Sequence, residues 1–369
     1  MKDIYKEIVS IGSDGWSKIM DAVPNPDMIL RKTGTTYAGY RELLYDPHLW
    51  SCVQSRKSGV LSTQYDIVGV DSQIALELLS DIKMEKLIDE VLDTILFGYQ
   101  PIEIYWEKIK ARIIPKATIA KPQELFYIDT NSKLKYRPAG KTKGVNLPKY
   151  KFLDLRYRAS YQNPYGIALL SKCYWPVKFK NGGMRFWVNF MERYGMPILI
   201  GKYTRGATQN EADSLVQHLA NMTEDSVIVT PNDIDIEIAE PHRYSSVRLY
   251  NEMIKLSNKE ISKAILSQTL TTDVTNGSKA AAETHYKIRE ELVLADKLLV
   301  EEAVNTLISY ISELNFGAII DAKFKFREEL EDIDTRLERD IKLLNSGAVE
   351  FTKEYWMEKY GYEKKDLVV

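Results

Sequence analysis

The sequence is poor in the residues that build disulfide frameworks and metal sites. Only two of its 369 residues are cysteine, Cys52 and Cys173, and neither belongs to a CxxC pair. The four histidines are scattered, without the HExxH or HxH spacing of metal ligands. These absences argue against a disulfide scaffold and a zinc site, and the low cysteine content fits a reducing cytoplasm.

The chain also lacks an excess of charge of either sign. Lysine and arginine number 50 and aspartate and glutamate number 52, which gives a formal net charge of -2. A dedicated DNA-binding protein is usually basic, so the composition does not predict long-range attraction to phosphates.

Long apolar runs are missing as well. The first residues, MKDIYKEIVSIGSDGW, contain acidic side chains and no extended apolar stretch, so a signal peptide is not predicted. Elsewhere the apolar runs fall far short of the ~20 residues that span a bilayer, and we predict no membrane segment.

Common catalytic and nucleotide-binding motifs are absent. A GxxxxGKS/T loop does not occur, which argues against an ATP-driven motor, and neither GxSxG nor GxGxxG occurs, which removes the commoner hydrolase and dinucleotide-binding classes. One acidic group could hold two Mg²⁺ ions in a nuclease, although a solvated turn at a helix start explains it better: Glu328, Glu329, Glu331 and Asp332. We predict no catalytic residue, metal or cofactor.

What the sequence does contain is enough apolar surface for a substantial core, since 44% of the residues are hydrophobic. In the first half, the spacing predicts two short helices over residues 37–59 that meet at Pro47, and a strand over 64–70. A long amphipathic helix is predicted over 74–97, ended by Gly98. Short alternating runs between residues 102 and 155 then predict a β-rich region.

The second half is dominated by predicted helices. A helix over 167–194 contains Pro176, Gly182 and Gly183, which we expect to kink or divide it. A compact αβ insertion follows, with strands over 198–203, 226–230 and 234–238 and a helix over 208–222 that begins with a capping box of Thr208 and Glu211. The remaining predictions are a helix over 244–266, a polar stretch over 269–278, the longest helix over 279–314, a strand around Phe324 and Phe326, and a helical hairpin over 334–344 and 352–359 closed by Gly347.

Aromatic and basic residues are interleaved in one part of the first long helix. The residues are Tyr174, Trp175, Phe179, Phe186 and Trp187, with Lys178, Lys180 and Arg185 between them. Such a pattern can stack bases in a single-strand groove. At helical spacing it is more typical of packing in a core, which we therefore predict.

Five segments in a fixed order carry a resemblance to a known family. They are DPHLWSCVQSRKSGV (46–60), LFGYQPIEIYW (96–106), NPYGIALL (163–170), FMERYGMP (190–197) and GSKAAAE (277–283). Each segment alone is weakly specific, but in this order they resemble the portal proteins of Mu-type tailed bacteriophages. The similarity covers roughly residues 37–347.

The resemblance implies an α+β phage portal fold. Its parts would be an N-terminal segment (1–36), a wing of helices and a β-rich region (37–166), a first stem helix (167–195), an αβ clip (196–243), a second stem helix (244–267), a tunnel loop (268–280), a long helix with a returning wing (281–333) and a C-terminal helical hairpin (334–369). Because the sequence ends soon after that hairpin, we expect the crown of larger portals to be reduced or absent.

The resemblance also implies a structural, non-enzymatic function. Portal subunits form a ring of about twelve copies at one capsid vertex, with heterologous contacts repeated around the axis. The expected partners are other copies of the chain, double-stranded DNA passing non-specifically through the channel, the large terminase subunit, and capsid and head-completion or neck proteins. We expect the virion as the location, after assembly in the host bacterial cytoplasm. A nearly neutral subunit suits a channel in which DNA must slide, since each neutralised phosphate adds affinity.

Two groups of candidate site residues follow from the resemblance. The tunnel loop is expected to form a flexible constriction, because such residues favour turns, although an ordinary interhelical loop is the alternative: Thr271, Thr272, Asp273, Thr275, Asn276, Gly277, Ser278 and Lys279. The clip surface is expected to bind terminase and neck proteins: Lys202, Tyr203, Thr204, Arg205, Gln209, Asp233, Asp235 and Glu237. Strand 234–238 would pair with a neighbouring subunit.

Two other functions stay open at this point. One is a metal-dependent nucleic-acid-processing enzyme that uses the acidic group at 328–332, which divalent-ion-dependent cleavage by the purified protein would indicate. The other is a portal-like adaptor of a domesticated phage element or gene transfer agent, which the sequence does not separate from a virion portal.

Overall fold

The computed structural model describes residues 22–138, 144–194, 199–204, 206–220, 227–232, 243–269, 279–327, 333–347 and 349–360. The chain divides into two compact units. The first comprises residues 1–62 and 67–324, and the second comprises residues 63–66 and 325–369. All the predicted channel and clip residues belong to the first unit.

The described chain opens with three helices, α2 (Met28–Lys32), α3 (Tyr37–Leu43) and α4 (Pro47–Leu61). The prediction of two helices meeting at Pro47 is confirmed. The Asp46 carboxylate caps α4 by accepting hydrogen bonds from the N–H groups of His48 (3.0 Å) and Leu49 (2.9 Å). Pro47 takes the first helical position, where its missing N–H costs nothing.

The prediction of one long helix over 74–97 is wrong. The segment forms α5 (Ser72–Leu78) and α6 (Met84–Phe97), separated by a short turn. Leu79 and Ile82 are buried within that turn, so the apolar spacing continues through it and hides the break from the sequence. Gly98 ends α6 as predicted, with a φ of 88° that favours glycine.

Two small antiparallel sheets confirm the predicted β-rich region. The first has the order β3-β2-β7, from β2 (Tyr99–Ile109), β3 (Arg112–Ala120) and β7 (Phe152–Arg156), and the second has the order β4-β5-β6, from β4 (Phe126–Ile128), β5 (Leu134–Tyr136) and β6 (Val145–Asn146). β3 tolerates Pro115 for two reasons. It is an edge strand, and Pro115 lies opposite Trp106, where the register between β2 and β3 shifts. A 3₁₀ turn, Gln123–Leu125, precedes β4.

Two long helices flank the αβ insertion, as predicted. They are α7 (Leu169–Tyr194) and α9 (Arg243–Leu266), and the insertion consists of β8 (Leu199–Tyr203), α8 (Gln209–Ala220) and β9 (Val227–Pro231). α7 runs through Pro176 and Gly182 as one helix, so neither residue divides it.

The predicted long helix is α10 (Lys279–Phe316), which at 38 residues is the longest in the described part of the chain. The strand predicted around Phe324 is confirmed as β10 (Lys323–Phe326), and it pairs with β1 (Tyr65–Val68).

An aromatic cluster lies at the centre of the first unit's core. Tyr99 is fully buried, and its ring packs edge-to-face against Tyr37 and Tyr165 at centroid distances of 5.7 and 5.5 Å. The Tyr99 hydroxyl donates a hydrogen bond to the Gln123 carbonyl at 2.8 Å. The cluster ties α3 to β2 and to the turn before α7, while residues of α4 and α9 extend the same core.

The second unit contains the predicted helical hairpin, α11 (Ile333–Asn345) and α12 (Lys353–Tyr360). Gly347 lies in the turn with a φ of 67°, as expected of a residue that closes it. The Asp340 carboxylate of α11 accepts hydrogen bonds from the hydroxyls of Tyr355 and Tyr360, each at 2.7 Å. These two bonds hold α12 against α11.

Candidate channel and docking segments

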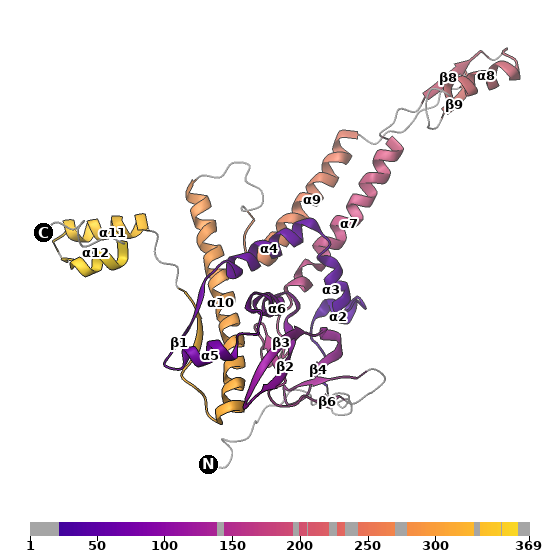
Figure 1. Ribbon diagram of the computed structural model, residues 1–369. Coiled ribbons are helices and arrows are strands. Elements are labelled where there is room, and N and C mark those ends of the chain that lie inside the picture. Colours follow the sequence, from indigo (N-terminus) through magenta and orange to yellow (C-terminus); the bar gives the residue numbers. More distant parts are fainter. Residues whose placement is uncertain are drawn as a thin grey trace. The chain divides into compact units, whose positions relative to one another are not determined.

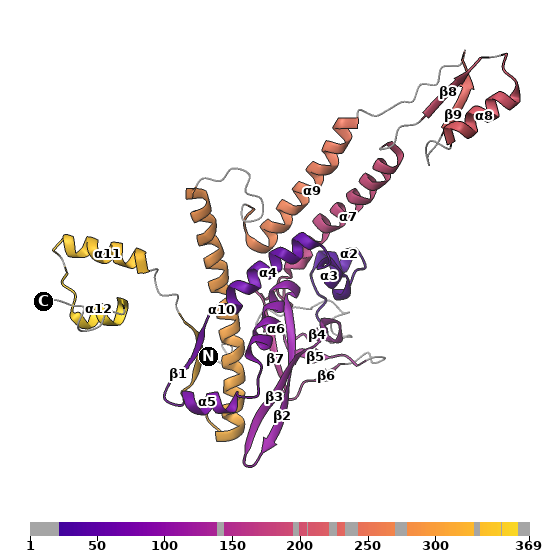
Figure 2. The same ribbon diagram turned by 45° about the horizontal axis from the view of Figure 1, so that its top comes forward.

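The helices predicted to form the stem lie side by side and run antiparallel. Phe190, near the end of α7, packs against Tyr250, near the start of α9, with ring centroids 6.1 Å apart. The helices lie close together at Gly183, where the Met253 Cε atom occupies the space of a side chain, 1.6 Å from the position of a Cβ atom. Figures 1 and 2 both show α7 beside α9. The αβ insertion is therefore connected to the rest of the first unit by two adjacent helices, α7 before it and α9 after it.

The first part of α7 is fixed to α4 by a buried ion pair. The Lys180 ammonium lies 2.8 Å from an Asp46 carboxylate oxygen, and the two side chains are 8% and 1% exposed. Asp46 is also the cap of α4. Lys180 therefore has a structural partner and does not belong with cations that could meet a nucleic acid.

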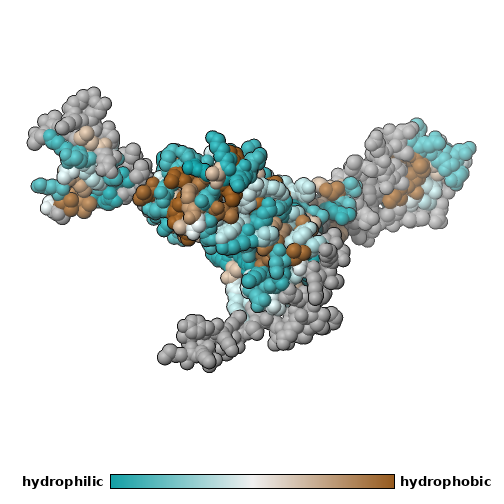
Figure 3. Space-filling view, turned by 60° about the horizontal axis from the view of Figure 1, so that its bottom comes forward, coloured by the Kyte–Doolittle hydropathy of each residue, from teal (hydrophilic) through white to brown (hydrophobic). Residues whose placement is uncertain are grey.

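The prediction that the aromatic residues of this helix pack in the core is wrong for three of them. Trp175, Phe179 and Phe186 are 48%, 58% and 66% exposed. Tyr174 and Trp187 are partly buried, as packing requires. Figure 3 shows that hydrophobic residues also reach the surface elsewhere, among hydrophilic ones. Several large exposed apolar residues on one helix indicate a contact surface.

The αβ insertion is a parallel strand pair joined by a helix. Leu199 of β8 lies opposite Val227 of β9, and α8 supplies the crossover that parallel strands need. α8 packs closely over Gly201, where a Cβ atom would lie 2.6 Å from a Leu219 methyl carbon. The Glu211 carboxylate accepts a hydrogen bond from the Thr208 N–H at 2.8 Å, which confirms the glutamate half of the predicted capping box.

Half of the predicted clip residues lie in the described part of the chain, at the end of β8 and the start of α8. Lys202, Thr204 and Gln209 are exposed, and Tyr203 is half-buried. The Gln209 amide donates a hydrogen bond to the Asp213 carboxylate at 3.2 Å. The others, Arg205, Asp233, Asp235 and Glu237, lie outside the described residues, as does the predicted strand 234–238.

The predicted channel segment lies between α9 and α10. Its members Thr271, Thr272, Asp273, Thr275, Asn276, Gly277 and Ser278 lie outside the described residues, and Lys279 is the first residue of α10. The helices on both sides are fastened to α4 by one side chain. The Arg56 guanidinium donates to the Ile265 carbonyl at 2.7 Å and to both Asp296 carboxylate oxygens at 2.7 and 2.8 Å.

Further contacts connect α4 to both α9 and α10. His48 Nε2 lies 2.8 Å from the Ser262 hydroxyl of α9. On the α10 side, a Cβ atom at Gly59 would lie 2.6 Å from a Val293 methyl carbon, so this close approach needs glycine. These contacts were not predicted, although α4 lies in the segment 46–60, the first of the five that carry the resemblance.

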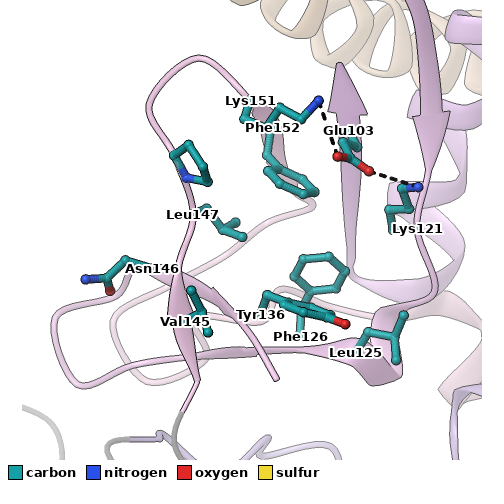
Figure 4. Close-up of a pocket in the computed structure, with 11 residues that line it drawn as sticks. Glu103, Lys121, Leu125, Phe126, Tyr136, Val145, Asn146, Leu147, Lys151 and Phe152 are labelled. Atoms are coloured by element: carbon teal, nitrogen blue, oxygen red, sulfur yellow. Dashed lines mark ion pairs between the residues drawn. The ribbon is translucent and has the colours of Figure 1, made fainter. Parts of the chain in front are cut away.

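A pocket of about 380 Å³ opens between the two small sheets. Its apolar wall and its charged rim are drawn in Figure 4: Phe126, Tyr136, Leu147 and Phe152 form the wall, and Glu103 lies 2.9 Å from Lys121 and 3.4 Å from Lys151. Burial alone would raise the pKa of Glu103, but the hydrogen bonds from Lys121 and Lys151 lower it further than burial raises it. Glu103 therefore stays ionised near neutral pH, which does not suit a general acid.

Within the described residues, no group of three or more His, Cys, Asp or Glu side chains is arranged to hold a metal ion. The acidic group considered above, Glu328, Glu329, Glu331 and Asp332, lies outside those residues. Cys52 and Cys173 are both free and buried. Across the same described ranges, every helix is too short or too polar to span a membrane.

A profile of the family described as portal protein of Mu bacteriophage matches residues 37–362 of the chain. The chain belongs to this portal family. It is 26% identical over 324 residues to the Mu-like prophage FluMu protein gp29 of Haemophilus influenzae, a match that covers 82% of this chain and 62% of that protein. It is 28% identical over 292 residues to the portal protein of Escherichia phage Mu, covering 75% of this chain and 56% of that protein.

Solved structures show the same fold. A chain in the virion of a native gene transfer agent particle matches with a TM-score of 0.56 and 12% identity, covering 87% of this chain and 93% of that one. A chain in the neck of an empty gene transfer agent particle matches with a TM-score of 0.57 and 14% identity, covering 91% and 94%. The predicted α+β portal fold is therefore confirmed. The chain spans less than two thirds of the length of both curated relatives.

Proposed function

We propose that this portal-family chain is a ring-forming head-tail connector subunit at one capsid vertex. Double-stranded DNA would pass through the ring during packaging and ejection, without sequence-specific contacts. The subunit number implied by the resemblance is about twelve, with the same heterologous contact repeated until the rotation closes. The proposal assigns no catalytic step and no cofactor to the chain.

The observation that carries the proposal is the α7–α9 helix pair with a small αβ unit at its end. In this assignment residues 37–166 form the wing, α7 and α9 form the stem, and residues 196–243 form the clip. Residues 268–280 form the tunnel loop, residues 281–333 complete the wing, and residues 334–369 form the C-terminal hairpin. Two helices that carry a separate lobe suit a subunit that must present that lobe to other proteins while the wing assembles with its neighbours.

The channel constriction is assigned to the polar segment from Thr271 to Lys279. Arg56 holds both flanking helices, through the Ile265 carbonyl of α9 and the Asp296 carboxylate of α10. A constriction built mainly from Thr, Asn, Ser and Gly can touch phosphates without adding a strong ionic attraction. Lys279 is the exception, because one lysine per subunit becomes a ring of positive charge.

The clip is assigned as the docking surface for the large terminase subunit and for neck proteins. Lys202, Thr204 and Gln209 are exposed where β8 passes into α8, so backbone turns and polar side chains are presented together. The two-stranded sheet β8–β9 also has open edges in the described part of the clip, which can accept a further strand.

Removal of the clip tests the docking assignment. A chain in which a short Gly-Ser linker replaces residues 196–243 should keep its wing folded and should lose binding to the large terminase subunit, measured by co-sedimentation of purified components. Terminase binding that survives the deletion would place the interface elsewhere on the chain.

A charge reversal tests the channel assignment. Lys279→Glu should leave the assembly intact and change DNA retention or packaging yield, because the cationic ring becomes an anionic one. The matched control is Lys342→Glu on α11, an exposed lysine far along the chain from the tunnel loop. Equal DNA retention in the two variants would contradict the assignment.

A further inference from the structure

One face of α7 presents aromatic rings to solvent. Trp175, Phe179 and Phe186 are separated by four and seven residues, which places them on the same side of the helix. The rings of Trp175 and Phe179 are stacked, with centroids 5.4 Å apart and an interplanar angle of 21°. Between them and Phe186 lies Gly182, where an added Cβ atom would meet no heavy atom within 4 Å. No neighbouring side chain therefore covers the face at Gly182.

The charges around this aromatic face are positive. Lys172, Lys178 and Arg185 are all exposed, and the helix contains a single acidic residue, Glu192. We call Trp175, Phe179, Gly182 and Phe186 with these three cations the basic aromatic face.

A complementary face lies on α10. Leu294 and Leu298 are 60% and 59% exposed, and their spacing of four residues places them on one side of the helix. Exposed carboxylates surround them, with one lysine, Lys287, beside them: Glu290, Glu291 and Glu302. We call these residues the acidic leucine face. This face presents two leucine side chains surrounded by carboxylates, whereas the face on α7 presents aromatic rings surrounded by lysine and arginine.

The two faces match in length. The basic aromatic face, over residues 172–186 of α7, extends about 21 Å, and the acidic leucine face with Lys287, over residues 287–302 of α10, extends about 22 Å, at about 1.5 Å per residue. Within one copy α4 lies between the two helices: it contacts α10 through Arg56 and Asp296, and it contacts α9 through His48 and Ser262. Figures 1 and 2 show α10 on one side of α4 and the α7–α9 pair on the other.

We propose that the basic aromatic face of one copy packs against the acidic leucine face of the next copy, and that this contact is the seam of the ring. The inference rests on the proposed ring function and names the surfaces that build it. Two different faces on opposite sides of α4 form a heterologous contact, the kind that closes into a ring. Burial of rings and leucines supplies the attraction, and the opposite charges set the register.

Charge reversal on each face and on both together tests the seam. The first variant carries Lys178→Glu and Arg185→Glu, the second carries Glu290→Lys and Glu291→Lys, and the third carries all four. Sedimentation velocity and native mass spectrometry of the full chain report the assembled fraction. Each double variant should raise the apparent dissociation constant about tenfold or more, because like charges then face each other. The fourfold variant should regain the assembly.

Controls separate a folding defect from a lost contact. Lys342→Glu with Lys353→Glu makes the same charge change as the first variant on exposed residues of the second unit, and it should assemble like the wild type. Circular dichroism should give every variant the helix content of the wild type. A variant that carries Phe186→Cys and Leu294→Cys should form ladders of linked chains with a bis-maleimide reagent.

The outcomes distinguish the seam from the ring. A wild-type chain that assembles while both double variants assemble equally well would overturn the seam and leave the ring function standing. Intramolecular linking alone in the cysteine variant, or fourfold reversal without recovery, would also overturn the seam. A wild-type chain that forms no closed assembly under any condition would overturn both proposals.

Discussion

Arg56 and Asp296 form a buried, two-pronged ion pair between α4 and α10. The guanidinium donates through Nε and Nη2 to the two carboxylate oxygens, at 2.7 and 2.8 Å, and the side chains are 6% and 1% exposed. Burial alone would lower the pKa of Arg56, but the hydrogen bonds and charge of Asp296 outweigh it and raise the pKa. Because Arg56 also holds the Ile265 carbonyl, α4 is bound to both α9 and α10, the helices on either side of the proposed tunnel loop.

Removal of one partner should destabilise the fold strongly. Arg56→Met leaves the Asp296 carboxylate buried without its counter-charge, so we expect a loss of about 3–5 kcal/mol in the free energy of unfolding. Chemical denaturation followed by circular dichroism measures the change. The combination of Arg56→Met with Asp296→Leu should recover part of the loss, because no uncompensated charge then remains.

A matched control for that prediction is Lys263→Met on α9. Its ion pair with Glu260 spans 2.7 Å, but both side chains are about half exposed, at 56% and 47%. Solvent screens such a pair, so the substitution should change stability little. Equal losses for Arg56→Met and Lys263→Met would contradict the structural role given to Arg56.

Substitution of Gly98 should also lower the free energy of unfolding. Its φ is 88°, and an added Cβ atom would lie 3.0 Å from the Tyr165 carbonyl oxygen. Gly98→Ala should therefore cost about 1–3 kcal/mol through backbone strain. Gly182 lies in the middle of α7, and an added Cβ atom there would meet nothing within 4 Å. Gly182→Ala should therefore stabilise the monomer slightly, because alanine favours a helix more than glycine does. Thermal unfolding of the two variants in parallel checks the opposite signs.

The two thiols should resist modification in the folded protein. Burial, with smaller contributions from Cys52 and Asp46, raises the pKa of Cys173 to about 12. Burial also raises the pKa of the Cys52 thiol. Few thiolates then exist at neutral pH, so iodoacetamide should label neither residue in buffer and both in denaturant, as counted by mass spectrometry. Rapid labelling of the native chain would show that this core opens.

The C-terminal hairpin should lose stability in acid. Burial alone would raise the pKa of Asp340, but hydrogen bonds from Tyr360, Tyr355 and Arg339 lower it below the ordinary value of 3.8. A carboxyl group with a lowered pKa stabilises the fold fully above its unfolded pKa, and this stabilisation is lost as the pH falls through the folded pKa. Hydrogen exchange of α11 and α12 should therefore show protection at pH 7 that weakens as the pH falls below the ordinary pKa of 3.8.

Asp340→Asn provides the comparison for the acid prediction. The amide cannot ionise, so the variant should have weaker protection at pH 7 and a smaller additional loss in acid. Identical pH profiles for the variant and the wild type would show that Asp340 does not hold the hairpin.

Most helices and strands could be predicted because their signals are local. Pro47 behind Asp46, Gly98 after an apolar helix and Gly347 in a polar turn each mark a boundary within a few residues. The break between α5 and α6 could not be predicted, since Leu79 and Ile82 keep the apolar period of a helix while they line a turn. α7 continues through Pro176 while it packs against α3, α6 and α9, and the local sequence does not encode these contacts.

The candidate site depends on contacts between distant residues and was predicted only in outline. Arg56 and Asp296 are 240 residues apart, and nothing near either one marks the other as its partner. Trp175, Phe179 and Phe186 were predicted to be buried and are exposed, because helical spacing shows which residues share a face but not whether that face is covered. The roles of the tunnel-loop residues and of all the clip residues remain predictions.

Electron microscopy of the purified chain in negative stain tests the central claim most directly. The account predicts closed rings with a central hole, seen end-on, and lobes that project from one side in side views. A population that contains only compact monomers, at every protein and salt concentration tried, would contradict it.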